Sequence, residues 1–194
     1  MGNLHSVYRA IQQIDSQLCV VNNASDLKKV HTLVVPGVGH FDLAIRNLEQ
    51  KGLTCVIKEW IEKGNPYIGI CLGMHILFEG SEEGTKEGLG IFKNKVRQLP
   101  TKVRPHMGWN RIDWQNSNWI NCSACPNPWA YFVHSYGLMA TMEKSWICAT
   151  TNYENINLVA AMEKQNCFVM QFHPEKSAQM GLWLWKQIIK KAAS

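Results

Sequence analysis

Residues 67–75 constrain the possible folds of this chain more than any other stretch. Apolar residues typical of β-strands lead to Gly69, Cys71 follows, and Gly73 precedes residues that favour a helix. We therefore expect a strand, a sharp turn and a helix, as in the G-x-S-x-G nucleophile elbow, with cysteine in place of serine. Both glycines fit such a turn because a nucleophile held on it leaves no room for neighbouring side chains.

Two interpretations of Cys71 are open at this point. In the catalytic one, the N–H group after the cysteine helps to stabilise an oxyanion, and the positive end of a helix over residues 74–78 favours thiolate over thiol. In the structural one, Cys71 is a small buried residue in a glycine-rich turn. A reactive partner elsewhere in the chain would decide between them.

The overall composition is that of one globular domain covering residues 1–194, because 46% of the residues are hydrophobic and 18% are charged. The net charge of +5 is mild and no basic block is interleaved with aromatic residues, so no nucleic-acid partner is expected. No apolar run approaches the roughly 20 residues of a membrane span, so no membrane partner is expected either. The seven cysteines are scattered, and no signal-peptide pattern precedes them, which favours a reducing cytoplasmic location without a disulfide framework.

The first part of the chain alternates between helical and strand patterns. We expect an amphipathic helix from Leu4 that ends near Asp15 and Ser16, a short strand over residues 18–21, a polar turn-rich segment over 22–29 and a strand over 32–35. Helices over residues 41–51 and around residues 56–61 precede the strand that reaches Cys71. This alternation predicts an α/β fold with a mainly parallel, flavodoxin-like sheet and helices on both faces, whose catalytic groups lie at the carboxyl ends of the strands.

After residue 78 the pattern changes to short strands. They are expected over residues 90–92, 95–97, 111–114 and 131–133, as a small antiparallel region attached to the α/β core. Residues 115–128 are polar and contain Cys122 and Cys125. These are either ordinary loop cysteines or part of a zinc or redox site; a lone C-x-x-C pair is weak evidence, and we predict no metal.

A second reactive group stands near the end of the chain. A strand over residues 168–172 leads into His173 and Glu175, and an amphipathic helix follows. In an extended segment, side chains two residues apart emerge on the same side, so Glu175 can orient the imidazole that takes a proton from Cys71. The alternative is a His-Pro turn with a surface glutamate. Two candidates at strand ends on one edge of a sheet favour an acyl-transfer enzyme.

Several separated motifs resemble the class I (triad) glutamine amidotransferases. They are Gly69-Ile70-Cys71-Leu72-Gly73, Pro36-Gly37-Val38-Gly39 and Gln171-Phe172-His173-Pro174-Glu175-Lys176-Ser177. A finer pattern is similar to the branch formed by glutaminase subunits of imidazole glycerol phosphate synthases: Met1-Gly2-Asn3-Leu4, Pro105-His106-Met107-Gly108-Trp109-Asn110 and Tyr131-Phe132-Val133-His134-Ser135-Tyr136. The resemblance covers nearly the whole chain.

The resemblance implies a mechanism that needs no cofactor. Cys71 would attack the side-chain amide of L-glutamine to form a glutamyl thioester and release ammonia, while His173 shuttles the proton and Glu175 orients it. The peptide groups of Val38 and Gly39 and the N–H of Leu72 would stabilise the oxyanion. Four further residues match glutamine-binding positions of the family, although each also has a plain structural interpretation as a strand-end or loop residue: His75, Glu83, Ser135 and Tyr136.

The resemblance also implies a partner. It is a (βα)8-barrel cyclase that forms a heterodimer with the glutaminase, receives its ammonia through a channel and makes imidazole glycerol phosphate for histidine biosynthesis. Residues expected to face the barrel are Trp109, Asn110, Tyr131 and Lys176. A core position for Trp109 is the alternative.

Three departures from the family pattern leave other functions open. The first strand of the family is absent before Met1, so we expect a gap in the sheet and a higher melting temperature for a chain extended upstream. His75 replaces the usual glutamine, so weaker or pH-dependent glutamine binding is expected, and residues 115–128 do not follow the family pattern. The alternatives are a paralogous glutaminase that feeds a different barrel, for instance in surface-polysaccharide amidation, and a scaffold subunit with little activity, against which the intact triad argues.

Overall fold

The computed structural model describes residues 2–15, 17–142 and 144–193. Its largest sheet has the strand order β1-β2-β11-β10-β9-β6. β1 (Leu33–Gly37), β2 (Tyr67–Cys71) and β11 (Cys167–Met170) are parallel neighbours. β10 (Ile156–Lys164), β9 (Ile147–Tyr153) and β6 (Asp113–Trp114) extend the sheet by antiparallel pairing. This is the α/β arrangement that the sequence predicts, with parallel strands at its centre.

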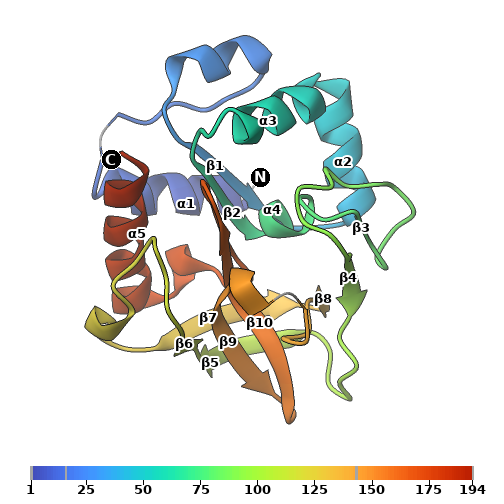
Figure 1. Ribbon diagram of the computed structural model, residues 1–194, viewed down its shortest axis with the longest axis vertical. Helices are drawn as coiled ribbons and strands as arrows, with labels where there is room; N and C mark the ends of the chain where they lie inside the picture. Colours follow the sequence, from blue (N-terminus) through green and yellow to red (C-terminus); the bar gives the residue numbers. More distant parts are fainter. Residues whose placement is uncertain (1, 16, 143, 194) are drawn as a thin grey trace.

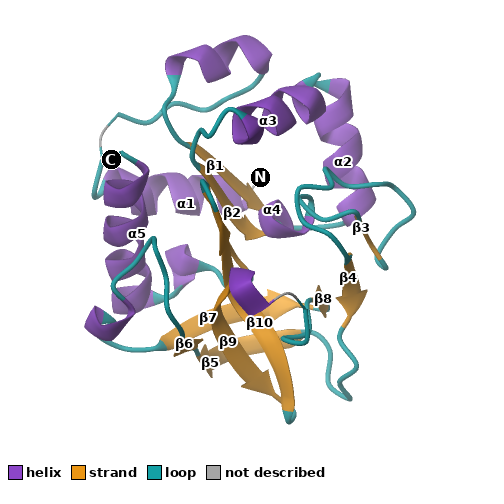
Figure 2. Cartoon of the chain, viewed as in Figure 1, coloured by secondary structure: helices purple, strands orange, loops and turns teal. Residues whose placement is uncertain are grey.

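Helices cover both faces of the parallel strands (Figures 1 and 2). α2 (Phe41–Gln50) and α3 (Leu53–Glu62) pack on one face, and α1 (Gly2–Gln12) and α5 (Ala178–Ala192) pack on the other. Successive residues of β2 divide between the two cores, because Tyr67 belongs to the first and Ile68 to the second. Burial on both faces explains why these strands are continuously apolar rather than alternating.

Smaller elements surround the carboxyl ends of the parallel strands. β5 (His106–Arg111) and β7 (Trp129–His134) form a two-stranded antiparallel ribbon, and β3 (Gly80–Ser81), β4 (Lys95–Gln98) and β8 (Tyr136–Gly137) form a three-stranded sheet. The remaining elements are short: the one-turn helix α4 (Leu72–His75) and the 3-10 helices η1 (Ala24–Lys29), η2 (Cys122–Ala124), η3 (Lys144–Trp146) and η4 (Pro174–Lys176).

Two predicted strands are wrong. Residues 18–21 form no strand, because none of the described strands pairs with them and β1 pairs only with β2. Residues 90–92 form a loop instead, since the N–H groups of Ile91 and Phe92 both donate to the carbonyl of Leu77. An apolar run becomes a strand only where a neighbouring strand offers hydrogen-bond partners.

Other element bounds differ from the prediction. The first helix ends at Gln12, and Ser16, like Met1, lies outside the described residues. The strand expected over residues 111–114 is interrupted at Ile112, and β9 and β10 are not predicted at all. The helix expected over residues 74–78 ends at His75, because Leu77 and Phe78 donate to carbonyls only three residues earlier.

Helix α5 lies directly against the segment that follows β11. A Cβ atom on Gly181 would lie 1.8 Å from the carbonyl oxygen of Pro174. The N–H of Gly181 donates to the carbonyl of Ser177, so the helix is anchored at the same place. Glycine at this position therefore sets how closely α5 approaches the residues that flank His173.

We expect Gly181→Ala to destabilise the protein. At an exposed helix-interior site the same change stabilises by up to about 1 kcal/mol, but here the methyl group must displace the backbone of Pro174, which costs about 1–3 kcal/mol. Chemical denaturation gives the free energy of unfolding. Gln179→Ala, at an exposed position of the same helix, is the control and should change it little; a Gly181→Ala protein as stable as the wild type would contradict this packing.

Candidate active site

Cys71 occupies a strained turn at the carboxyl end of β2. Its φ is 52° and its ψ is −107°, in a region that non-glycine residues rarely adopt. A Cβ on Gly69 would lie 2.7 Å from the carbonyl oxygen of Gly73, and one on Gly73 would lie 1.8 Å from that of Val35. The prediction that both glycines are needed for space is confirmed. The hydroxyl of Tyr67 donates to the Gly73 carbonyl at 2.7 Å and fixes the turn from behind.

The helix after this turn is shorter than predicted. α4 has a single turn, from Leu72 to His75. A helix dipole grows with the number of aligned peptide groups, so one turn gives little support to a negative charge on Cys71. Side chains around the sulfur must supply most of that support.

His173 and Glu175 form a buried pair beside Cys71. The Nδ1–H of His173 donates to Oε1 of Glu175 at 2.8 Å, and both side chains are almost completely buried. The alternative of a His-Pro turn with a surface glutamate is therefore wrong. Glu175 lies in the 3-10 helix η4 rather than in an extended segment, so the turn, and not a strand, brings the carboxylate to the ring.

The pairing leaves Nε2 of His173 facing the sulfur. This buried atom has no partner of good hydrogen-bond geometry among the described residues, yet Cys71 is close enough to affect the charge of the ring. Burial alone lowers the pKa of His173, but contacts with Cys71 and Glu175 outweigh burial and raise the pKa to about 9. At neutral pH the ring is therefore a cation that can balance a thiolate.

A pocket of about 310 Å³ opens onto Cys71. The structure brings together here every residue that the sequence analysis assigned to oxyanion or substrate binding. Three more lining residues, Pro105, Val133 and His134, come from two of the motifs that carry the family resemblance. The complete lining is Val38, Gly39, Cys71, Leu72, His75, Glu83, Pro105, Val133, His134, Ser135 and Tyr136.

Glu83 reaches the pocket from a loop anchored on α2. Its Oε2 accepts from the N–H of Phe41 at 2.8 Å, and the carboxylate of Asp42 accepts from the N–H groups of Thr85 and Lys86. These backbone hydrogen bonds lower the pKa of Asp42. The sequence analysis gave Asp42 no role, because nothing in the local pattern of α2 indicates which loop its exposed side chain holds.

His75, which lines the pocket, lies next to Gln171, which does not. Nε2 of His75 is 2.7 Å from Oε1 of Gln171, and Nε2 of Gln171 donates to Sγ of Cys71 at 3.5 Å. Burial lowers the pKa of His75 to about 4, although the Gln171 contact opposes this, so the ring is neutral at physiological pH. The sequence analysis quoted Gln171 within a motif without assigning it a function.

The β5–β7 ribbon places apolar side chains on the outer surface near the pocket. Trp109 is 52% exposed, so its alternative interpretation as a core residue is wrong. The Trp109 and Tyr131 rings are 6.2 Å apart, and Nζ of Lys176 lies 5.5 Å from the centre of the Tyr131 ring. Asn110 points to the opposite face, where its amide donates to the carbonyl of Asn152 at 2.9 Å.

Cys122 and Cys125 are free, half-buried thiols, and burial raises the pKa of both. Among residues 2–15, 17–142 and 144–193, no group of three or more histidine, cysteine, aspartate or glutamate side chains is arranged to hold a metal ion.

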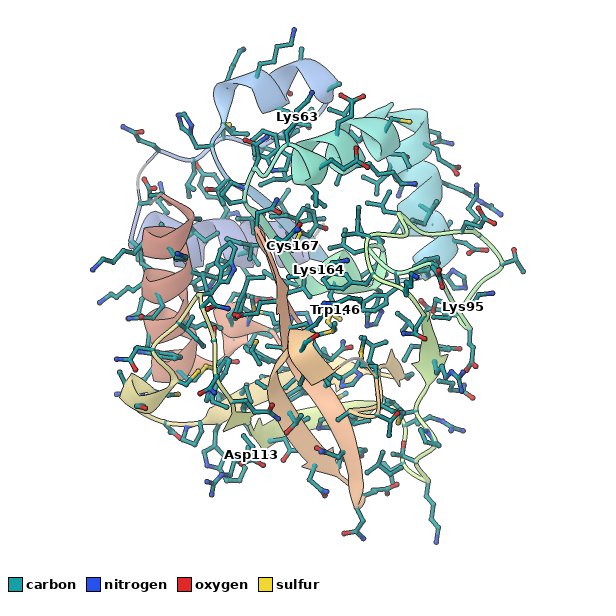
Figure 3. All side chains as sticks on the ribbon, in the orientation of Figure 1. Lys63, Lys95, Asp113, Trp146, Lys164 and Cys167 are labelled. Atoms are coloured by element: carbon teal, nitrogen blue, oxygen red, sulfur yellow. The ribbon has the colours of Figure 1, made fainter. Side chains whose placement is uncertain are left out.

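A larger hollow of about 600 Å³ lies elsewhere, and its lining includes Trp119, Trp146 and Lys164. Figure 3 labels Trp146 and Lys164. Its lining contains neither cysteine nor histidine. Nζ of Lys164 donates to the carbonyl of Ile91 at 3.1 Å and lies 4.5 Å from the centre of a Trp146 ring. These contacts keep the lysine against the protein, so the smaller pocket at Cys71 is the candidate active site.

Comparisons with known proteins agree with this choice. The family model "Glutamine amidotransferase class-I" matches residues 1–182. "Imidazole glycerol phosphate synthase subunit hisH" of Cyanidioschyzon merolae is 66% identical over 199 residues, which cover 100% of this chain and 95% of that protein. "Imidazole glycerol phosphate synthase subunit HisH" of Thermosynechococcus vestitus is 41% identical over 195 residues, with 97% and 92% covered.

Solved structures share the fold at low sequence identity. A structure described as "Crystal structure of glutamine amidotransferase" superposes with a TM-score of 0.78 at 14% identity and covers 100% of this chain and 95% of its own. The glutaminase domain of Trypanosoma brucei CTPS superposes with a TM-score of 0.69 at 18% identity, with 97% and 87% covered. Within the described part of the chain, no helix has the length and apolar character needed to cross a membrane.

We expect Glu175→Gln to lower the pKa of His173, because the carboxylate that stabilises the imidazolium is removed while burial continues to oppose it. Proton-detected NMR titration of labelled histidine rings measures this pKa. Glu59→Gln, which removes an exposed partner of Lys63, is the control. An unchanged titration of His173 in Glu175→Gln would contradict the pairing.

The same shift predicts the pH dependence of stability. A folded-state pKa raised from 6.5 to about 9 contributes stability that is complete below about pH 6.5 and disappears as pH rises through about 9. The difference in unfolding free energy between wild type and Glu175→Gln should therefore be largest at neutral or lower pH and shrink above it.

Proposed function

This chain belongs to the class I glutamine amidotransferase family, and we propose that Cys71, His173 and Glu175 hydrolyse L-glutamine to glutamate and ammonia in the pocket that opens onto Cys71. The chain is a glutamine amidotransferase, an enzyme that releases ammonia for a synthetic reaction. The observation that carries the assignment of residues is the buried His173–Glu175 pair whose free ring nitrogen faces the only cysteine of the pocket lining.

The first half of the reaction forms a thioester. The Cys71 thiolate attacks the side-chain carbonyl carbon of glutamine, and the oxygen gains negative charge as the tetrahedral intermediate forms. The N–H of Leu72 and the peptide groups of Val38 and Gly39, which line the pocket, are placed to stabilise that oxygen. His173 donates its proton to the amide nitrogen, the C–N bond breaks, and ammonia leaves.

The second half regenerates the cysteine. The now neutral His173 takes a proton from water as the water attacks the thioester carbonyl, the C–S bond breaks, and glutamate and the Cys71 thiolate are released. Glu175 keeps the ring oriented through both proton transfers. Glu83, Ser135 and Tyr136 contact the substrate from the pocket wall, and no cofactor takes part.

The names of the similar proteins indicate where the ammonia goes. Both relatives are described as subunits of imidazole glycerol phosphate synthase. This chain is therefore the glutaminase subunit of that enzyme, which pairs with a (βα)8-barrel cyclase subunit in histidine biosynthesis. Identity of 66% over the whole chain supports this pathway over a paralogous one, and the buried His173–Glu175 pair speaks against an inactive scaffold.

The outer face of the β5–β7 ribbon is our proposed contact for the barrel. Trp109, Met107 and Trp129 are 52%, 57% and 46% exposed. Tyr131 adjoins Trp109, and Lys176 adjoins Tyr131. Exposed aromatic side chains with a neighbouring cation are typical of docking surfaces. We take residues 1–194 as one domain, and its seven free cysteines support a reducing compartment such as the cytoplasm.

Replacing the nucleophile tests the reaction. We expect Cys71→Ala to lower glutaminase activity by at least about 1,000-fold, because covalent catalysis is lost. Glutamate and ammonia release are measured with and without the cyclase barrel of the same genome. Cys55→Ala, at an exposed cysteine, should behave as wild type. Full activity of Cys71→Ala with the barrel would refute the mechanism. Wild-type activity that does not change when the barrel is added would refute the proposed partner.

A second experiment tests the docking surface. We expect Trp109→Ala to weaken binding to the barrel by about 30-fold, the usual cost of truncating a central aromatic anchor. Isothermal titration calorimetry measures the dissociation constant. Leu43→Ala on α2, where the leucine is 57% exposed, is the matched control and should leave it unchanged. Equal effects of the two substitutions would exclude a specific role for the ribbon.

A further inference from the structure

The sheet register brings Gln171 beside the nucleophile. β11 pairs with β2 in parallel, with Met170 opposite Ile70, so the next residue of each strand, Gln171 and Cys71, are also neighbours. The Gln171 side chain belongs to a residue that is only 1% exposed, and its Nε2 donates to Sγ of Cys71 at 3.5 Å. Gln171 does not line the pocket, so this contact reaches the sulfur from a buried residue outside the lining.

The orientation of the Gln171 amide follows from its contact with the sulfur, because a thiolate can only accept a hydrogen bond and Nε2 is the donor of the amide. Oε1 can only accept a hydrogen bond, so the 2.7 Å contact with His75 requires the proton to be on Nε2 of the His75 ring. The reversed amide would place its oxygen against the sulfur, where two groups that only accept hydrogen bonds would face each other once the thiol is ionised.

We propose that Gln171 is a catalytic residue that stabilises the Cys71 thiolate with a hydrogen bond from its amide, and that His75 is the positioning residue that holds the amide in the donating orientation. This inference deepens the proposed glutaminase function and rests on Cys71 being its nucleophile. A thiolate accepts a hydrogen bond far more strongly than a thiol does, so the bond favours the charged form.

The arrangement explains two features of the site. The one-turn helix α4 gives little dipole support, and Gln171 supplies a donor in its place. In the low-dielectric interior, the His75–Gln171–Cys71 chain polarises each bond and strengthens the last one. The same donor stabilises the sulfur when the thioester breaks and the thiolate leaves. His75 lines the pocket, as the sequence analysis expected, and its contact with Gln171 gives it a second role that acts through Gln171.

Alkylation of Cys71 measures this directly and needs no glutamine. Wild type, Gln171→Leu and its control share the titratable groups that face the sulfur and its neighbours: His173, Glu175, His75, His134 and Glu83. Iodoacetamide modification of the Cys71 peptide is followed by mass spectrometry across a pH series, which separates it from the exposed Cys19 and Cys55. The two substitutions of His75, by leucine and by glutamine, are compared with each other in a separate series.

We expect Gln171→Leu to move the midpoint of this pH profile upward by about one unit, the effect of losing a hydrogen bond to a charged group. The limiting rate at alkaline pH should rise about threefold, because a less stabilised thiolate is more nucleophilic. A substitution that only disturbed packing would not raise both the pH midpoint and the limiting rate of alkylation. Gln50→Leu, at an exposed position of α2, is the control and should change neither value.

The His75 variants test the positioning role. His75→Leu removes the donor to Oε1 and should move the midpoint upward, whereas His75→Gln supplies an amide N–H and should restore it. An unchanged midpoint in folded Gln171→Leu would overturn the proposal. If Gln171→Leu does not fold, equal midpoints for His75→Leu and His75→Gln would overturn it instead.

Failure of this inference is distinguishable from failure of the glutaminase proposal. An inactive Cys71→Ala combined with an unmoved midpoint in Gln171→Leu would remove only the role of Gln171. An active Cys71→Ala protein would show that Cys71 is not the nucleophile. A shift in the pH midpoint of Cys71 alkylation would then say nothing about catalysis.

Discussion

The parallel register of β2 between β1 and β11 is the constraint on which the rest of the structure depends. Gly37 lies opposite Cys71 on one side, and Met170 lies opposite Ile70 on the other, which places Gln171 and then His173 next to the turn. A slip of one residue would exchange the two faces of a strand and carry these side chains to the opposite core. Burial of β2 and β11 on both faces makes such a slip costly, because every apolar contact would change. The fold therefore specifies the spacing of groups that are about one hundred residues apart in the sequence.

The strain at Cys71 is maintained by the packing around it. A left-handed backbone at a non-glycine residue costs on the order of 1–3 kcal/mol and persists only where neighbouring structure holds it. Here Gly69, Gly73 and the Val35 carbonyl approach so closely that no other side chain fits at the two glycines, and the Tyr67 hydroxyl holds the Gly73 carbonyl. The turn places Cys71 in the pocket lining and its sulfur within hydrogen-bond distance of Gln171. Rigidity of this kind fixes a nucleophile relative to its base without any contribution from a long helix.

Much of this arrangement could be predicted from local patterns, and the failures have physical causes. The glycines around Cys71 and the Pro36–Gly39 segment indicate their own turns, so the strand ends could be predicted locally, whereas the other pocket residues came from the family resemblance. Residues 18–21 and 90–92 are apolar enough for strands, but strand formation depends on a partner that a local window does not contain. Gln171 was quoted without a role because its meaning comes from pairing between β11 and β2. Trp109 was left undecided, since alternation along a ribbon shows two faces but not which of them meets the core.

The two faces of the β5–β7 ribbon connect the proposed docking surface with the pocket. On the inner face, Nδ1–H of His134 donates to the Tyr136 carbonyl at 2.9 Å, so its Nε2 must accept from Nδ1–H of His106 at 3.0 Å. Burial lowers the pKa of His134 to about 3 and that of His106 to about 4, so both rings are neutral and this direction of donation is kept at physiological pH. Nε2 of His106 then accepts from the Asn110 amide at 3.2 Å. A partner that binds the outer face therefore contacts the same two strands whose inner face lines the glutamine pocket. Neutral rings suit this position, because protonation of either histidine would introduce a charge next to Tyr136 and disturb it.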